Sequence, residues 1–153
     1  MSKYYLGLDG GSTYLKAALI KDGIVINTVV YPTGIDNNAT AKKIVAALCK
    51  KHNITRTDIG YIMATGYSRK ILEVADDDIS EITAHAYGVR ITAPKGYRPG
   101  MVVDIGGQDS KIIYLDANYN VKNFTMNDKC AAGTGRFLEM MARTMEMNLD
   151  QMS

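Results

Sequence analysis

The chain contains one pattern twice, first as Leu6-Gly7-Leu8-Asp9-Gly10-Gly11-Ser12-Thr13-Tyr14-Leu15-Lys16 and again as Met101-Val102-Val103-Asp104-Ile105-Gly106-Gly107-Gln108-Asp109-Ser110-Lys111. In each copy an apolar run ends in an aspartate, a glycine-containing turn follows, and a second apolar run begins. A constant offset of 95 residues pairs Asp9 with Asp104, Gly11 with Gly106 and Lys16 with Lys111. The repeat predicts two strand–turn–strand units.

Both glycine turns have the composition of a phosphate-binding loop. Glycine allows positive φ and a close approach of the ligand, and successive backbone N–H groups in a turn form an anion-binding concavity. The residues expected to bind phosphate are Gly10, Gly11, Ser12, Thr13, Gly106, Gly107 and Gln108. A pair of ordinary hairpins with glycine turns is the alternative interpretation, and the repeated spacing favours the phosphate site.

The two aspartates are the candidate catalytic residues. Asp9 and Asp104 each end a predicted strand, and a carboxylate there can orient Mg²⁺ or the attacking water. Lys16 and Lys111 are candidates for neutralising phosphate charge. Lysines that extend from a strand into solvent are the alternative for both positions.

Length and composition limit the class of protein. The chain has 153 residues, 46% hydrophobic and 22% charged, with a formal net charge of +2. Such a charge does not indicate a nucleic-acid partner, and no apolar run has transmembrane length. The first residues enter a strand directly, without the pattern of a signal peptide, and two distant cysteines do not indicate a disulfide framework. We therefore expect a cytoplasmic protein with no membrane partner.

Periodicity and turn residues predict an α/β fold built from ribonuclease-H-like units. The expected strands are 4–9, 14–20, 24–31, 61–66, two in the second repeat, and 121–126, and the expected helices are 38–52, 81–88 and 133–147. Residues 94–100, rich in proline and glycine, form the predicted linker. The expected domains are 1–94, a complete β-β-β-α-β-α unit, and 95–153, the first half of another. We interpret the chain as a fragment because the second copy stops early.

Three further features outside the repeat have a structural and a functional interpretation. Cys49 lies on the apolar stripe of the helix at 38–52 and is predicted to be a buried core thiol. His85 is interpreted as an interior or interface histidine rather than a catalyst. The run Asp76-Asp77-Asp78 is predicted to be a solvated turn, with a cation site as the alternative.

Cys130 lies in a stretch of small residues, Cys130-Ala131-Ala132-Gly133-Thr134-Gly135-Arg136, before a predicted amphipathic helix. A helix N-terminus favours the thiolate form of cysteine, which serves as a nucleophile or as a ligand of soft metals and iron–sulfur clusters. A small residue in a tight turn is the alternative. One cysteine cannot hold a [4Fe–4S] cluster, although a two-fold dimer would double what one chain supplies.

The repeated turns resemble those of the actin, heat-shock ATPase and sugar-kinase superfamily. Within it, residues 8–16, 81–86, 103–111 and 127–136 together resemble the 2-hydroxyacyl-CoA dehydratase activators, grouped with benzoyl-CoA reductase ATPase subunits of the BadF/BadG/BcrA/BcrD type. The resemblance covers nearly all of the chain.

The resemblance implies a homodimeric ATPase that couples hydrolysis of ATP to ADP, with Mg²⁺, to low-potential electron transfer. One [4Fe–4S] cluster would bridge the subunits, with Cys130 as one of two cysteine ligands from each. The implied partners are a dehydratase component and an upstream donor such as ferredoxin or flavodoxin. A sugar or carboxylate kinase, with Asp109 as the nearest candidate base, is one alternative. A non-catalytic, actin-like nucleotide-binding module is another.

Overall fold

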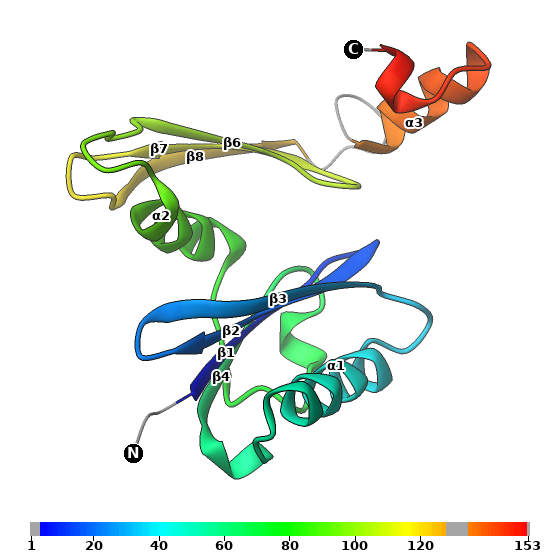
Figure 1. Ribbon diagram of the computed structural model, residues 1–153. Coiled ribbons are helices and arrows are strands. Elements are labelled where there is room, and N and C mark those ends of the chain that lie inside the picture. Colours follow the sequence, from blue (N-terminus) through cyan, green and yellow to red (C-terminus); the bar gives the residue numbers. More distant parts are fainter. Residues whose placement is uncertain (1–3, 128–134, 153) are drawn as a thin grey trace. The chain divides into compact units, whose positions relative to one another are not determined.

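The computed structural model describes residues 4–127 and 135–152, which form two compact units divided between Glu81 and Ile82 (Figure 1). The first unit is a mixed sheet with one long helix, α1, against it. The second is a smaller antiparallel sheet packed on helix α2. The α/β class expected from the sequence is confirmed.

The sheet of the first unit has five strands in the order β3-β2-β1-β4-β5. Its strands are β1 (Tyr4–Gly10), β2 (Tyr14–Lys21), β3 (Ile24–Pro32), β4 (Ile59–Thr65) and β5 (Asp77–Asp78). The first three form an antiparallel meander, whereas β4 pairs parallel to β1 and β5 pairs parallel to β4. The ends of β1 and β4 therefore lie at the same edge of the sheet, which is where the first glycine turn begins.

Helix α1 (Asn37–His52) covers one face of this sheet. It begins after Asp36, whose side chain accepts a hydrogen bond from the backbone N–H of Ala39 at 3.0 Å, and it ends at Asn53 in the left-handed conformation. Its buried residues recur at helical spacing and pack on alternate residues of the strands. The resulting core includes Ala41, Ile44, Val45 and Leu48 from the helix and Leu6, Leu8, Leu15, Leu19 and Ile62 from the sheet.

The second unit contains the other copy of the repeat. Its elements are α2 (Glu81–Thr92), β6 (Met101–Ile105), β7 (Ser110–Leu115), β8 (Val121–Asn127), α3 (Gly135–Thr144) and the short 3-10 helix η3 (Leu149–Met152). The three strands are antiparallel in the order β6-β7-β8. Ala86 of α2 packs against Ile113 and Leu115 of β7, which form a small core.

The structure differs from the sequence-based expectations in several places. Helix α2 continues through Gly88 to Thr92. Because its apolar residues pack on β7, the boundary between the compact units lies between residues 81 and 82, whereas the sequence placed it between residues 94 and 95. The aspartate run expected as a turn includes the short strand β5. Two 3-10 helices, η1 (Arg56–Asp58) and η2 (Arg69–Ile71), flank β4. The predicted helix at 133–147 is described from Gly135 to Thr144.

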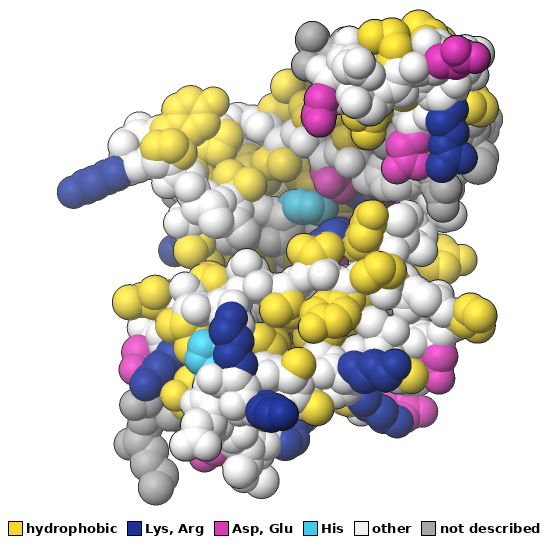
Figure 2. Space-filling view, turned by 45° about the vertical axis from the view of Figure 1, so that its right-hand side comes forward, with side chains coloured by type: hydrophobic (Ala, Val, Ile, Leu, Met, Phe, Trp, Pro, Cys, Tyr) yellow, Lys and Arg dark blue, Asp and Glu magenta, His cyan; other side chains and the backbone are white. Residues whose placement is uncertain are grey.

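The surface mixes apolar and charged side chains. Figure 2 shows hydrophobic side chains lying among lysine, arginine and acidic side chains on the visible face. Within the described ranges, none of the helices combines the length and the apolar character needed to span a bilayer.

Candidate functional site: two glycine-turn hairpins

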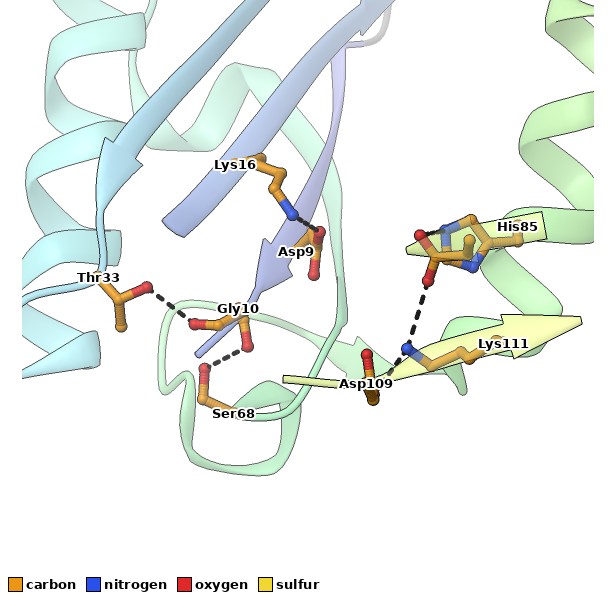
Figure 3. A network of polar contacts seen from close by, with 10 residues as sticks. Asp9, Gly10, Lys16, Thr33, Ser68, His85, Asp109 and Lys111 are labelled. Carbon is orange, nitrogen blue, oxygen red and sulfur yellow. Dashed lines mark hydrogen bonds and ion pairs between the residues drawn. The ribbon is translucent and has the colours of Figure 1, made fainter. Parts of the chain in front are cut away.

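The first hairpin places Lys16 beside Asp9. The two residues are directly opposite in the antiparallel pairing of β1 and β2, so their side chains lie on the same face of the sheet. The Nζ atom of Lys16 donates to Oδ2 of Asp9 at 2.7 Å (Figure 3). Both side chains remain accessible, with 50% of Lys16 and 34% of Asp9 exposed. This carboxylate is therefore paired and still open to solvent.

The second hairpin repeats this register with a more enclosed ion pair. Lys111 is opposite Asp104 in the pairing of β6 and β7. Its Nζ lies 3.3 Å from Oδ2 of Asp104 and 2.8 Å from Oδ2 of Asp109, and only 4% of its side chain is exposed. His85 of α2 approaches the same aspartate, with Nε2 3.7 Å from Oδ1 (Figure 3). Asp104 is thus surrounded by a lysine and a histidine within its own unit.

Both lysines lie beside the strand-end aspartate, so neither extends freely into solvent. The second hairpin also contains Asp109, the candidate base of the kinase hypothesis. Its Oδ2 lies 2.8 Å from Nζ of the buried Lys111, so this carboxylate is already engaged in an ion pair. The catalytic roles of Asp9 and Asp104 remain predictions.

Each turn is closed by the same backbone hydrogen bond. The N–H of Gly11 donates to the carbonyl oxygen of Tyr14 at 3.1 Å, and the N–H of Gly106 donates to that of Asp109 at 2.8 Å. These two glycine N–H groups, expected to bind phosphate, are therefore used inside the turns. A Cβ atom at Gly106 would lie 2.6 Å from Oδ1 of Asp109, so a larger residue would require this carboxylate to move.

The carbonyl groups of the first turn are held by two residues that sequence reasoning did not identify. The hydroxyl of Thr33, just after β3, donates to the carbonyl of Gly11 at 2.8 Å. The hydroxyl and the backbone N–H of Ser68, after β4, both donate to the carbonyl of Gly10 at 2.9 Å. These bonds join residues 22 and 58 positions apart, a separation that local patterns do not reveal.

Gly66 brings the end of β4 against the first turn. Its φ of +91° is one that residues with a side chain rarely adopt. A Cβ atom at this position would lie 2.5 Å from Oδ1 of Asp9 and 2.7 Å from the backbone N of Gly10. Glycine is therefore required for the close approach that places Ser68 on the turn.

Two residues of the aspartate run, Asp76 and Asp78, form ion pairs with arginines. Asp76 receives both hydrogen bonds from one nitrogen of Arg56, at 3.1 and 3.2 Å, and also caps the backbone N–H of Ile62. Asp78 pairs with Arg69 at 3.0 Å. Over residues 4–127 and 135–152, no group of three or more potential metal-binding side chains is assembled. The alternative of a cation site at this run thus gains no support.

Cys49 differs from the expected buried core thiol. It is half-buried at the edge of the core and lines a groove of about 500 Å³ with residues of α1 and of the segment after η2. Burial raises the pKa of its thiol, and nearby Arg56 partly opposes this effect. Cys130, the predicted cluster ligand, lies outside the described residues.

Two hairpins with equivalent aspartates, glycine turns and cross-strand lysines, together with this sheet order, define an actin-like ATPase fold. The chain belongs to the BadF/BadG/BcrA/BcrD ATPase family, which it matches over residues 6–153.

Named relatives place the chain near the dehydratase activators. It is 43% identical over 151 residues to the activator of lactoyl-CoA dehydratase from Anaerotignum propionicum, covering 98% of this chain and 57% of the relative. It is 42% identical over 156 residues to the (R)-2-hydroxyglutaryl-CoA dehydratase activating ATPase from Acidaminococcus fermentans, covering 100% and 58%. The solved activator of 2-hydroxyisocaproyl-CoA dehydratase from Clostridium difficile, with bound ADPNP, has a TM-score of 0.83 and 40% identity, covering 95% and 53%. The chain therefore spans about half the length of the relatives that it matches.

Proposed function

We propose that the full-length protein is an ATPase that activates a 2-hydroxyacyl-CoA dehydratase or a related reductase. The observation that carries this proposal is the repeated hairpin, in which an aspartate at a strand end lies opposite a lysine beside a glycine turn. Relatives named as dehydratase activators at about 40% identity support the same activity.

In this proposal the turns bind the phosphates of ATP and the aspartates orient the reacting groups. Amide groups at Ser12, Thr13, Gly107 and Gln108 supply donors to the phosphate oxygens. Asp9 and Asp104 present carboxylate oxygens, the ligand type that Mg²⁺ prefers, and both are partly exposed to water. When bound, Mg²⁺ would neutralise part of the negative charge of the phosphates. Lys16 and Lys111 hold the two carboxylates in place.

In this proposal, electron transfer depends on Cys130 as a ligand of an iron–sulfur cluster. A cysteine thiolate is the ligand that iron–sulfur clusters require, and a homodimer would double the cysteines available from one chain. A [4Fe–4S] cluster, when bound, supplies a low-potential electron for the dehydratase component. A ferredoxin or flavodoxin is the proposed source of that electron.

The test measures iron, acid-labile sulfide and visible absorption of the full-length protein purified without oxygen. We expect about four irons per dimer, lost in Cys130→Ser and kept in the matched control Cys49→Ser. ATP hydrolysis measured in parallel should fall in Asp9→Asn and Asp104→Asn. Protein without iron would overturn the electron-transfer proposal. Iron-containing protein that does not hydrolyse ATP would overturn the ATPase proposal and favour a non-catalytic nucleotide-binding module.

A further inference from the structure

The carbonyl oxygens of the first glycine turn are occupied by donors from two distant segments. The hydroxyl of Ser68 donates to the carbonyl of Gly10, and the hydroxyl of Thr33 donates to the carbonyl of Gly11 (Figure 3). The backbone N–H of Ser68 donates to the same carbonyl of Gly10. The backbone N–H of Thr33 also donates to the carbonyl of Thr13, at 3.0 Å. Two residues thus fix three of the carbonyl groups between positions 10 and 13.

Both residues are built into the first unit rather than attached to its surface. Only 4% of Ser68 and 4% of Thr33 is exposed. A Cβ atom at Gly10 would collide with Oγ of Ser68, so the glycine leaves the space that this hydroxyl occupies. The carbonyl of Thr33 accepts a further bond at 2.9 Å from the hydroxyl of Thr40, which lies in the first turn of α1. The glycine turn is therefore connected to β4 and to α1.

The amide groups of the same turn have a different environment. Over the described ranges, neither Ser12 nor Thr13 donates its backbone N–H to a protein acceptor. A carbonyl oxygen carries partial negative charge and repels a phosphate, whereas an N–H group attracts it. In the first turn, internal donors hold the carbonyl groups and the amide groups of Ser12 and Thr13 remain available. Such a turn is suited to an anionic ligand.

We propose that Ser68 and Thr33 are positioning residues that hold the turn at 10–13 in its phosphate-binding conformation. This inference rests on the proposed function, because it takes the phosphates of ATP as the ligand. Ser68 and Thr33 both lie in the first unit, whereas in the second turn the carboxylate of Asp109 pairs with Lys111 of the same hairpin at 2.8 Å. Phosphate binding at the first turn should therefore be sensitive to these two hydroxyls.

The experiment compares Ser68→Ala and Thr33→Val with wild type in the full-length protein. Calorimetry gives the dissociation constants of MgATP and of adenosine, which lacks phosphate. We expect each variant to weaken MgATP binding about three- to tenfold, as loss of one intramolecular hydrogen bond typically allows, and to leave adenosine binding unchanged. Thr33→Ser retains the hydroxyl and should restore MgATP affinity.

A matched control separates positioning from general loss of stability. The hydroxyl of Thr65 donates to the carbonyl of Ile79 at 3.0 Å, a similar bond in the same unit that does not involve the turn. Thr65→Val should keep wild-type affinity for both ligands. Equal weakening of MgATP and adenosine, or unchanged MgATP affinity in Ser68→Ala and Thr33→Val, would overturn the inference. Absence of MgATP binding by the wild type would instead overturn the proposed function.

Discussion

Replacing each cross-strand lysine by methionine tests whether the two hairpins are stabilised to different extents. Lys16→Met and Lys111→Met are the same change at equivalent positions of the repeat. Methionine keeps much of the apolar side chain and removes the charge. In the first hairpin one half-exposed ion pair is lost, whereas in the second a buried cation that bridges two carboxylates is lost.

The expected free energies differ because burial differs. An exposed ion pair contributes about 0–1 kcal/mol, so Lys16→Met should cost no more than this. Removing one partner of a buried pair costs about 3–5 kcal/mol. The carboxylates of Asp104 and Asp109 are 25% and 29% exposed, so water replaces part of the lost interaction. We therefore expect Lys111→Met to destabilise its hairpin by about 2–4 kcal/mol.

Amide hydrogen exchange followed by mass spectrometry measures each hairpin separately in the full-length protein. A local loss of about 2 kcal/mol accelerates exchange roughly 30-fold, since about 1.4 kcal/mol corresponds to a factor of ten. Peptides from β6 and β7 should show this acceleration in Lys111→Met, and peptides from β1 and β2 should change little in Lys16→Met. Similar acceleration in both variants, or none in Lys111→Met, would refute the argument from burial.

Three other perturbations test single features of the fold. Gly66→Ala should lower the free energy of unfolding, measured by urea titration, by at least about 2 kcal/mol, because the positive φ and the close contact with the first turn both oppose a Cβ atom. The control Gly23→Ala should cost less, because Gly23 also has a positive φ but has open space around it. Cys49, followed through its own peptide by mass spectrometry, should react slowly with iodoacetamide at neutral pH and rapidly in urea, because burial raises the pKa of its thiol. Equal rates would contradict this. Hydrogen bonds from the side chain and backbone of Asn120 lower the pKa of Asp116. The ionised carboxylate should therefore stabilise the β7–β8 turn above the ordinary aspartate pKa, and this stabilisation should be lost as pH falls through the lowered value. Amide exchange in the turn should accelerate in acid for the wild type, and Asp116→Asn should remove this pH dependence.

The two hairpins of the candidate site were predictable because each is local in sequence and the pattern occurs twice. A strand, a short turn and a returning strand form one continuous segment, which local patterns can predict. The ion pair of Asp9 with Lys16 was not among the predictions, because it depends on the register of the hairpin. The second copy has the same register, with Asp104 opposite Lys111. The α/β class follows from the same segments.

What the sequence did not reveal depends on contacts between distant segments. Ser68 reaches Gly10 across 58 positions, and a single serine in a loop has no local pattern that marks it. Strand β5 has only two residues, both aspartate, which are unfavourable in strands. Helix α2 follows the first unit in sequence, but its apolar face packs on β7, and chain order alone does not indicate this preference.

The equal spacing of aspartate and lysine also defines a rule for sequence comparison. In both hairpins the two residues are seven positions apart and directly opposite across the turn. Because neighbouring residues of a strand alternate between the two faces, one inserted residue in the returning strand would move the lysine to the other face. A search for distant homologues of these hairpins should therefore keep this interval constant and allow the residues inside the turn to vary.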